Sequence, residues 1–465
     1  MEKIQFKINR SLTSEELAAF EIVKTLQIAG YETYLAGGAV RDMLLDVNIH
    51  DIDIATSARP EEIKQIFKDS YDRGKAFGVM AVKIDEHEFE IATFREDIGG
   101  VDHRHPETVK FSSAELDAKR RDFTINGLFY DPIKEMIIDH VNGLTDLKRK
   151  QIRFIGNAAD RISEDYLRIL RAARFAARFN FTIEKKSFDE ILKNVRKLEE
   201  ISVERVREEL SKMLFLVNRD QAILVLDQLN ILDELLPELK TLKNVPQPKE
   251  FHAEGDCFTH TLLALQNIGS TDSEELVWCV LLHDIAKPET IGYRPILKNK
   301  TSITFFDHDI KSAEKAEEIL RRLRFSHHFI DNVSWAIRQH MRIVHAFTGM
   351  SERKQKKLFV DSNIELLLNL THADLSASLR PNHLPDMTMY EDALALRKKF
   401  ESEANQEELQ QVKNFDLVNG NDIMEIMHIP ASAEVGEIKD WLEQLYLDGK
   451  INTRVEALEV MKRFK

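Results

Sequence analysis

The chain has 465 residues, of which 43% are hydrophobic and 31% charged, a composition typical of globular proteins and a length that suggests roughly three domains. No apolar run approaches the ~20 residues that span a bilayer, the N-terminus lacks the apolar core of a signal peptide, and Cys257 and Cys279 form no CxxC motif, so we expect no membrane partner, no disulfide framework and a reducing cytoplasm. The net charge of −14 argues against broad nucleic-acid binding, although residues 116–186 hold 15 Lys and Arg against 10 Asp and Glu, a pattern that fits either an RNA-binding region or a solvated helix face.

Residues 1–150 mix strand-like and helix-like patterns. YETYLAGG and FEIATFR predict strands that end at loops, and MAVKIDEHEFEIATF predicts a hairpin around Asp85, Glu86 and His87. ARPEEIKQIFKDS predicts a helix with Pro60 in its first turn. This part of the chain is therefore expected to contain a small mixed sheet.

The remainder of the chain is predicted to be overwhelmingly helical from Ser163 onward. SEDYLRILRAARFAARF predicts a helix capped by Ser163 with acids in its first turn. PQPKEFH, near Pro246 to His252, predicts a linker before a second helical block that ends near Phe400.

Two carboxylates on alternate residues, Asp51 and Asp53, predict a metal site. Residues i and i+2 of a strand point to the same side, about 6–7 Å apart along the strand. Magnesium prefers one or two carboxylates together with substrate phosphates. A third carboxylate completes most polymerase-like sites, and of Glu88 and Glu90 on the following strand we favour Glu90.

The segment before these acids, AGGAVRDML, predicts a phosphate-binding turn. Gly37 and Gly38 allow the backbone to approach a ligand, although a tight turn alone explains a glycine pair equally well. Arg41 would lie near the phosphates and Asp42 near a helix N-terminus as a dipole partner. Arg95, at the end of the later strand, could hold a triphosphate.

Five segments in order make a specific resemblance: LAGGAVRDMLL…HDIDIAT, ATFRED…RHPETVKF, DAKRRDFTINGLFYD, EDYLRILRAARFAARF and ISVERVREELSKML. Together they resemble the motifs of the class II tRNA nucleotidyltransferases, the CCA-adding enzymes, and of the related bacterial poly(A) polymerases. The resemblance implies that Asp51 and Asp53 bind the metals that activate an RNA 3′-hydroxyl. It also implies sugar and phosphate contacts by Arg121, Asp122 and Asn126, and a steadying role in the neck for Glu204, Arg205 and Glu209.

The same resemblance implies that Asp165 and Arg168 read the base edge of incoming CTP or ATP. As residues i and i+3 they would be neighbours on one helix face, where an acceptor and a donor fork can imitate a pairing edge. The alternative is a first-turn acid with an intrahelical ion pair. Of the arginines that share this arc, Arg168 and Arg171 are predicted to contact nucleotide, whereas Arg174 and Arg178 could equally be solvated.

The chain departs from the family pattern in two places. Asp46 and His50 replace a glycine and a basic residue, and the loop after Arg95 carries His103 and His105. In the family this loop helps the switch from C to A addition. Its ordinary length argues against an enzyme that adds only CC.

A second constellation lies in the later helices and resembles the HD-domain phosphohydrolases. Its members are His260, His283, Asp284, His308, His340 and Asp374. The resemblance implies that one aspartate bridges two metals, and His with carboxylate ligands suits Mn, Fe, Ni or Co as well as Mg. Lys287 is a candidate phosphate contact. The alternative is that the histidines are hydrogen-bonded core residues, or that a relic site only braces the tail.

We therefore expect an α+β protein. A nucleotidyltransferase head with a small mixed sheet occupies residues 1–150, an all-α neck and body that binds nucleobase and RNA occupies 151–245, an all-α HD domain occupies 246–400, and a small helical tail occupies 401–465. The expected activity is addition of CCA to the tRNA 3′ end from CTP and ATP by two-metal catalysis with Mg²⁺, with phosphohydrolysis at the HD site. The alternatives are an A-adding enzyme or poly(A) polymerase, or a nucleotide-sensing HD protein without transferase activity. The sequence does not give the oligomeric state.

Overall fold

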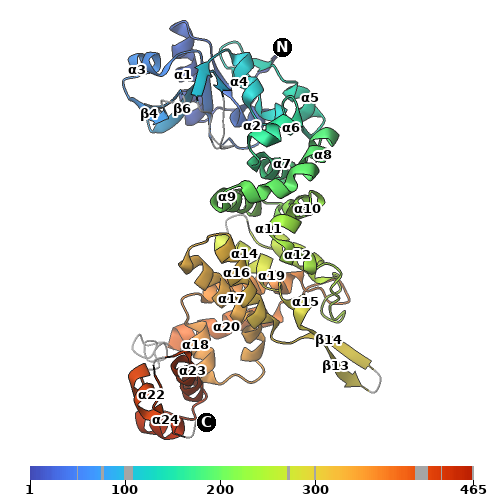
Figure 1. The fold of residues 1–465 in the computed structure, drawn as a ribbon, viewed down its shortest axis with the longest axis vertical. Helices are drawn as coiled ribbons and strands as arrows, with labels where there is room; N and C mark the ends of the chain where they lie inside the picture. Colours follow the sequence, from blue (N-terminus) through green and yellow to red (C-terminus); the bar gives the residue numbers. More distant parts are fainter. Residues whose placement is uncertain are drawn as a thin grey trace. The chain divides into compact units, whose positions relative to one another are not determined.

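The computed structural model describes residues 1–49, 51–74, 78–98, 108–269, 273–297, 300–403, 417–430 and 432–462. The chain divides into two compact units, Met1–Leu235 and Leu236–Lys465 (Figure 1). The first unit contains a mixed sheet followed by helices and the second is mainly helical, which confirms the predicted α+β class. Among the described residues no helix is both long and apolar enough to cross a bilayer.

An eight-stranded sheet forms the centre of the first unit. In spatial order its strands are β1 (Glu2–Gln5), β10 (Met136–Asp139), β9 (Leu128–Asp131), β2 (Thr33–Ala36), β3 (Asp53–Thr56), β6 (His87–Thr93), β5 (Val79–Ile84) and β4 (Ser70–Gly74). β3 and β6 are parallel and the other neighbours antiparallel, so the sheet is mixed as predicted but larger. The β5–β6 hairpin turns at Asp85 and Glu86, also as predicted.

Short helices and a ribbon complete the head. The helices are α1 (Ser14–Ile28), α2 (Gly38–Leu44), α3 (Pro60–Ile66), α4 (Ala114–Arg120), η2 (Thr124–Asn126) and α5 (Gly143–Lys148), and the ribbon pairs β7 (Arg95–Ile98) with β8 (Thr108–Phe111). Pro60 is the first residue of α3, as predicted, because its fixed φ suits a helix start and its missing N–H is not needed there. A buried cluster that includes Ala36, Phe94 and Phe129 joins the sheet to these helices.

The helical end of the first unit corrects one predicted boundary. It contains α6 (Ala158–Glu164), α7 (Leu167–Phe179), α8 (Lys185–Asn194), η3 (Val195–Glu200), α9 (Val203–Leu214), α10 (Arg219–Gln228) and α11 (Ile231–Leu235), with a short parallel pair β11 (Gln151–Ile152) and β12 (Thr182–Ile183). Ser163 lies inside α6 and does not cap α7, because Asp165 adopts an extended conformation that separates the two helices. The acids predicted for the first turn of α7 therefore precede that helix.

The second unit is built from helices around an apolar core. They are α12 (Pro237–Thr241), α13 (Cys257–Gln266), α14 (Glu274–Leu282), α15 (Lys287–Thr290), α16 (His308–Arg322), α17 (His327–Ala346), α18 (Glu352–Phe359), α19 (Ile364–Ala377) and α20 (Thr388–Glu403), followed by α22 (Gly420–Met427), α23 (Ala433–Leu447) and α24 (Arg454–Met461). α14 is buried from Leu276 to Leu282. The last three helices share a small core that includes Ile423, Ile438 and Leu442, in agreement with a helical tail.

Two features of the second unit differ from the predictions. A hairpin of β13 (Ile291–Leu297) and β14 (Lys300–Phe305) interrupts the region expected to be entirely helical (Figure 1). The alternating β-branched and aromatic residues of TSITFF are the signal that would have indicated it. The segment around Pro246 that was predicted to be a linker lies within the second unit. Gln247 is buried there, and its side chain accepts a hydrogen bond from Lys287.

Candidate functional site

One cavity of the first unit, about 570 Å³ in volume, brings the predicted metal-binding acids and the predicted base reader together. Its walls carry seven arginines and four aspartates, and their full set is Gly37, Gly38, Arg41, Asp51, Asp53, Arg120, Arg121, Asp122, Asn126, Asp165, Arg168, Arg171, Arg174, Phe175 and Arg178. Guanidinium groups bind phosphate through paired hydrogen bonds, and their charge does not titrate away. The cavity therefore suits a polyanionic ligand such as a nucleoside triphosphate.

The two acids of the first motif reach this cavity from the end of β3. Asp53 is the first residue of the strand and Asp51 precedes it, so the prediction that both lie within a strand is wrong for Asp51. Both aspartates are exposed, whereas Ile52 and Ile54 are 6% and 1% exposed and pack into the core. The alternation that a strand would give is thus kept, and both carboxylates face the ligand space.

The charge around Asp53 favours a bound cation. Although Asp53 is solvent-accessible, the surrounding protein partly desolvates its carboxylate and raises the pKa; Arg121 opposes the rise, and the negative charges of Glu90 and Asp51 add to it. A divalent ion at these carboxylates would relieve that repulsion, and an all-oxygen donor set suits Mg²⁺. The residues present therefore fit the predicted metal.

Glu90, the predicted third carboxylate, lies on the strand next to Asp53. The parallel register pairs Ile54 with Ile91, which places Asp53 and Glu90 one residue earlier on neighbouring strands. The Glu90 carboxylate lies 3.3 Å from Arg73 Nε and does not line the cavity. Among the described residues, no group of three ligand atoms within 4.8 Å of one another includes these acids. The catalytic role of Glu90 stays a prediction.

The first glycine of the Gly-Gly pair has a defined steric role. Gly37 has φ 68° and ψ −128°, a conformation that side chains disfavour, and a Cβ there would lie 2.5 Å from Arg121 Nη1. The Arg121 guanidinium is itself held by Asp117, whose Oδ2 lies 3.1 Å from Nη2. Gly37 therefore leaves room for Arg121 to sit over the turn at the mouth of the cavity.

Arg41, which lines the cavity, is paired with Asp42, and both side chains are buried. Arg41 donates to Asp42 Oδ1 at 2.7 Å and to Asn126 Oδ1 at 2.5 Å. Arg178 donates to the other oxygen of Asp42 at 3.0 Å. The prediction that Asp42 acts at the N-terminus of its helix is wrong, because α2 begins at Gly38 and its first turn holds no acid. Asp42 holds two arginines in place and does not itself line the cavity.

Asp122 clamps Arg171 across the cavity. Its Oδ2 accepts from Nε and Nη2 of Arg171 at 2.9 and 2.7 Å, and its Oδ1 accepts from Asn126 Nδ2 at 2.9 Å. Burial alone would raise the pKa of Asp122, but the charge and hydrogen bonds of Arg171, with the bond from Asn126, outweigh it and lower the pKa. Two donors of one guanidinium that share the oxygen Oδ2 fix the orientation of Arg171.

The predicted base reader sits in a break between two helices. Asp165 has φ −158° and ψ 106°, so the prediction that it shares a helix face with Arg168 is wrong. Its Oδ1 accepts from Leu167 N–H at 3.1 Å and its Oδ2 from Arg205 Nη2 at 2.7 Å. Arg168 is the second residue of α7 and donates to Arg161 O and Glu164 Oε2 at 2.7 and 2.6 Å. Both side chains line the cavity, and the residues that hold them in place lie outside it.

The two outer arginines of α7 are paired, which removes the alternative that they are solvated. Arg174 Nε donates at 2.7 Å to Glu209, which is 3% exposed, and Arg178 bonds Asp42. The Glu209 pair connects α7 with α9, as expected of a residue that steadies the neck.

Two predictions of the head stay open. Arg95 begins β7, is half-buried and does not line the cavity. Its backbone N–H lies 3.3 Å from Asp117 Oδ1. His50, His103 and His105 lie outside the described residues.

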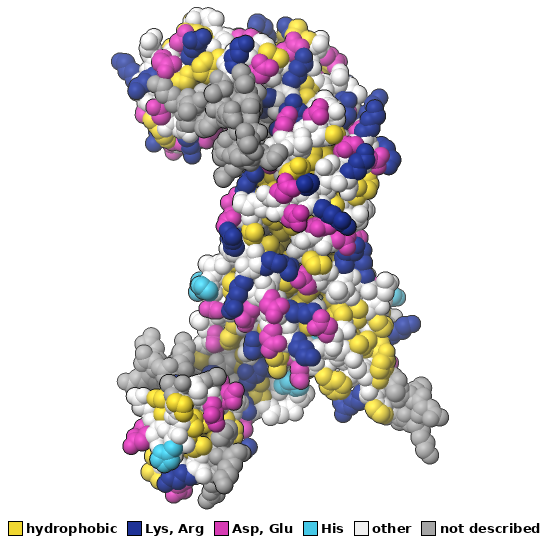
Figure 2. Space-filling model, in the orientation of Figure 1, with side chains coloured by type: hydrophobic (Ala, Val, Ile, Leu, Met, Phe, Trp, Pro, Cys, Tyr) yellow, Lys and Arg dark blue, Asp and Glu magenta, His cyan; other side chains and the backbone are white. Residues whose placement is uncertain are grey.

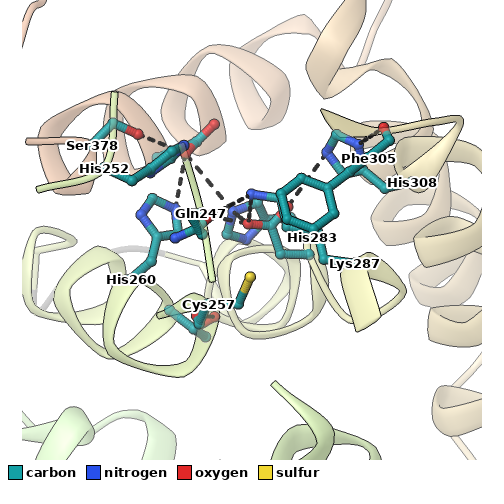
Figure 3. Close-up of polar contacts among 12 residues, drawn as sticks. Gln247, His252, Cys257, His260, His283, Lys287, Phe305, His308 and Ser378 are labelled. Atoms are coloured by element: carbon teal, nitrogen blue, oxygen red, sulfur yellow. Dashed lines mark hydrogen bonds and ion pairs between the residues drawn. The ribbon is translucent and has the colours of Figure 1, made fainter. Parts of the chain in front are cut away.

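The second constellation is gathered in one buried cluster of the second unit. Its six members come from α13, the end of α14, α16, α17 and α19, and Figure 3 labels three of them, His260, His283 and His308. Asp284 lies at the centre, with Oδ2 3.3 Å from His283 Nε2 and Oδ1 3.5 Å from His308 Nε2. Asp374 Oδ1 lies 3.0 Å from His260 Nε2 and 3.9 Å from His283 Nε2. All six predicted residues are therefore together: five form two groups of three that share Asp284, and Asp374 adjoins the first group through His260.

Each histidine of this cluster is oriented through its outer nitrogen. Nδ1 of His283, His308 and His340 lies 2.9, 3.0 and 2.6 Å from the carbonyl oxygens of Val280, Phe305 and Ile337, and Nδ1 of His260 lies 2.9 Å from Glu254 Oε1. These acceptors assign the proton to Nδ1 and turn Nε2 toward the centre. Metal-binding histidines are typically held in this way.

The inward-facing atoms are mostly hydrogen-bond acceptors, so a bound cation would suit them better than the contacts they make with one another. Nε2 of His308 and Nε2 of His340 lie 3.2 Å apart, and with both protons on Nδ1 neither can donate. Nε2 of His260 and Nε2 of His283 are buried without a well-directed hydrogen bond among the described residues, whereas Asp284 Oδ2, which also lacks one, has Lys287 Nζ as its ion-pair partner. His and carboxylate donors in this arrangement suit Mn, Fe, Ni or Co.

Charges in the cluster support neutral imidazoles at His308 and His340 beside ionised acids. At His260 the effect of burial is outweighed by hydrogen bonds to Asp374 and Glu254, which raise its pKa to about 9. Burial lowers the pKa of His308 to about 4, and burial with the nearby His283 lowers the pKa of His340. Burial opposes ionisation of Asp284, but His283 and Lys287 hold its pKa well below the usual range. Lys287 Nζ lies 2.6 Å from Asp284 Oδ2, and Figure 3 shows it beside the ring of Phe305.

Sequence reasoning missed Gln247, which accepts from Lys287 Nζ at 2.9 Å, because it lies in a segment read as a linker. Glu254 lies behind this cluster, where its Oε1 accepts hydrogen bonds from both His260 and His252. His252 lines a second cavity of about 680 Å³ together with Gln247, Lys249 and Pro381.

Comparisons with known proteins agree with this arrangement. The chain matches three family models: the poly A polymerase head domain over residues 33–153, the probable RNA and SrmB-binding site of polymerase A over 180–243, and the HD domain over 258–374. These matches confirm the resemblance predicted from the motifs.

Individual relatives cover different shares of the chain. It is 48% identical over 206 residues to a CCA-adding enzyme of Streptococcus mutans, which is 44% of this chain and 51% of that protein. The chain thus spans about half the length of the curated relatives it matches. The crystal structure of the Bacillus stearothermophilus CCA-adding enzyme in complex with CTP aligns with a TM-score of 0.60 at 26% identity, over 97% of this chain and 98% of that one. The Thermotoga maritima CCA-adding enzyme complexed with tRNA shares the fold, with a TM-score of 0.55 at 22% identity over 99% of each chain.

Proposed function

We propose that this chain, which joins a poly A polymerase head domain and an RNA-binding segment to an HD domain, adds CCA to the 3′ end of tRNA from CTP and ATP. The observation that carries the proposal is the arginine-lined cavity, which holds the acids of β3 and the reader before α7 on its walls. The names of the curated relatives and the CTP-bound neighbour support it. The domain boundaries at residues 150, 245 and 400 belong to the same proposal.

The residues of the head would act by binding and orientation. Asp51 and Asp53 would hold Mg²⁺, which supplies a Lewis acid for in-line attack of a 3′-hydroxyl on an α-phosphate with release of pyrophosphate. Arg121 and Arg171 would bind the phosphates, each oriented by a carboxylate. The Asp165 acceptor and the Arg168 fork would face the base edge of CTP or ATP, so the protein would replace a nucleic-acid template.

A tRNA series tests this proposal against its alternatives. The chain is incubated with tRNA ending at the discriminator base, at C or at CC, together with labelled CTP and ATP and Mg²⁺. Use of CTP on the shortest substrate supports CCA addition. Use of ATP on the CC form alone supports an A-adding enzyme, long tails support a poly(A) polymerase, and no incorporation supports a nucleotide sensor. Asp69→Ala, which removes an exposed acid of the same unit, serves as the control for loss through Asp53→Ala.

We also infer that the HD cluster is a metal-dependent phosphohydrolase centre. The four Nε2 atoms turned inward around Asp284 support this, because a cluster that only braced the fold would pair these atoms with donors. His260, His283, Asp284, His308, His340 and Asp374 would hold the metal, and Lys287 would contact a phosphate. By family resemblance the substrates would be RNA ends with a 2′,3′-cyclic phosphate or small nucleotides.

The hydrolase is tested with a generic chromogenic phosphodiester and Mn²⁺, Ni²⁺ or Co²⁺. Asp284→Ala is expected to abolish turnover, whereas Asp331→Ala, an exposed change on α17, keeps it. Equal rates in the two variants would remove the hydrolase from the proposal and leave the transferase untouched.

A further inference from the structure

The arginine-lined cavity of the first unit contains one side chain that is neither polar nor small. Among the described residues of its wall, Phe175 of α7 carries the only aromatic ring. This residue is 4% exposed, so very little of the ring is open to a nucleobase. Its contacts are instead with the cations around it.

Three guanidinium groups converge on the Phe175 ring. The Cζ atoms of Arg174, Arg41 and Arg171 lie 4.5, 4.9 and 5.5 Å from the ring centre. The negative face of an aromatic ring attracts cations within about 6 Å of its centre. Arg171 and Phe175 are residues i and i+4 of α7, which are neighbours on one helix face, whereas Arg41 belongs to α2. One ring therefore contacts arginines of two helices.

The same three arginines are also bound by carboxylates. A distance of 2.7 Å joins Arg41 Nε to Asp42, Arg171 Nη2 to Asp122 and Arg174 Nε to Glu209. A hydrogen bond holds a guanidinium at its N–H groups, but the group can still swing about that bond. Contact with the ring restricts this swing. Each guanidinium thus has both a hydrogen-bond partner and a packing partner.

Repulsion among the arginines explains why a ring suits this position better than another acid. The cavity wall gathers seven arginines against four aspartates, whereas acidic and basic side chains are interspersed on the face of the molecule that Figure 2 shows. Burial lowers the pKa of Arg174, Glu209 opposes the fall, and the charge of Arg171 adds to it. A further carboxylate would relieve that repulsion but would cancel positive charge that attracts a triphosphate. An aromatic ring attracts the cations and leaves the net charge of the cavity unchanged.

The hydrophobic core fixes the Phe175 ring from behind. Phe123, which is fully buried, meets it edge to face, with the ring centres 5.6 Å apart and the planes at 83°. Phe179, one helical turn later, is parallel to it within 10°, with the centres 6.1 Å apart. Both arrangements are favoured between aromatic rings. The core therefore sets the position of the ring, and the ring sets the positions of the guanidinium groups.

We propose that Phe175 is a positioning residue of the arginine-lined cavity. Its ring holds Arg41, Arg171 and Arg174 in the arrangement that binds the triphosphate of the incoming nucleotide, and it acts only through them. This inference rests on the proposed transferase for the identity of the ligand. An aliphatic side chain at this position would fill the space beside Phe123 but would not attract the cations.

Fluorination of the ring tests the proposal at nearly constant shape. Phe175 is replaced by phenylalanines that carry one, two and three ring fluorine atoms, which withdraw electron density from the ring face. The Kd of the full chain is measured for CTP with Mg²⁺ and for inorganic tripolyphosphate, which has no base. We expect both Kd values to rise with each added fluorine, by about 2- to 30-fold over the series, because the attraction of the ring for the phosphate-binding arginines weakens.

Phe154 supplies the matched control. It is 2% exposed, its ring centre lies 4.9 Å from that of Phe123, and it does not line the cavity. The same fluorine series at Phe154 should leave both Kd values unchanged, and the melting temperatures of the two series should agree. Constant Kd values across the Phe175 series would overturn the positioning role, as would a rise for CTP without a rise for tripolyphosphate.

The two readouts separate this inference from the proposed transferase. Binding is measured without RNA, so a chain that binds CTP but does not incorporate it would refute the transferase, and the fluorine series would still decide the role of Phe175. A chain that incorporates CTP but shows no fluorine trend would refute the positioning role alone. Failure of the wild type to bind either probe would refute both.

Discussion

Substitution of Gly37 by alanine separates the role of the glycine turn in catalysis from its role in folding. The added Cβ would lie 2.5 Å from Arg121 Nη1, so the guanidinium must withdraw by about 1 Å to reach ordinary contact at 3.4 Å or more. Because the clashing atom is the far end of a flexible side chain, the clash itself costs little stability. The disfavoured backbone conformation at φ 68° costs about 1–3 kcal/mol in addition.

We expect Gly37→Ala to lower activity more strongly than it lowers the stability of the fold. A displacement of about 1 Å in a substrate-positioning group can lower kcat/KM about 100-fold. The assay is incorporation of labelled CTP into tRNA that lacks CCA, at a temperature where the far-ultraviolet circular dichroism is native. Urea titration gives the accompanying loss of stability.

The chain supplies a matched control for this prediction. Gly156 also has a positive φ, +74°, but a Cβ there would meet nothing within 4 Å. Gly156→Ala should lower stability and leave kcat/KM for CTP unchanged. Equal kcat/KM values for the two variants would refute the idea that Gly37 makes room for a phosphate-binding Arg121.

The remaining predictions concern both units. Asp53→Ala should abolish nucleotide incorporation and keep the wild-type circular dichroism; incorporation near the wild-type rate would contradict the assignment. Excess Mn²⁺ should raise the melting temperature of the second unit, since a ligand at 100 times its Kd contributes about 2.7 kcal/mol, and Asp284→Ala should remove this shift. Glu254→Gln should weaken metal binding about 10- to 100-fold in a chelator competition, because the amide is a poorer acceptor for Nδ1 of His260; wild-type affinity would count against an orienting role. Asp122 has a lowered pKa, so its contribution to stability is full above its ordinary pKa of 3.8 and is lost as the pH falls below it; urea midpoints between pH 6 and 3 should therefore fall more for the wild type than for Asp122→Asn.

The sequence was most informative where chemistry follows local spacing. The Asp51-Ile52-Asp53 alternation, the Pro60 helix start and the Asp85 turn are each determined by neighbours in the chain, and each was found as expected or within two residues of it. The six HD residues were also identified together, although they come from five helices. Their order along the chain carried that prediction through the family resemblance, and no local rule would have gathered them.

The failures share a physical cause, which is dependence on residues far along the chain. Asp165 leaves the helix, and its carboxylate is held by Arg205, 40 residues later. Asp42 was assigned to a helix dipole, but it pairs with Arg178, 136 residues away. A propensity argument sees an acid near a helix start in both cases. Only the tertiary partners show that these acids orient arginines.

The same dependence on distant partners weighs against a relic HD site. A buried acceptor without a donor costs about 1–3 kcal/mol, so the facing Nε2 atoms of His308 and His340 destabilise the fold unless a cation lies between them. No other described contact of the two histidines offsets this loss of stability. Their Nδ1 atoms bond carbonyl oxygens, which any other hydrogen-bond donor could satisfy equally well. Replacement of either histidine by an apolar residue would remove the conflict at once. The cluster instead presents four inward-facing nitrogens, with the Glu254 anchor behind His260, and that is the arrangement expected of a metal-binding site.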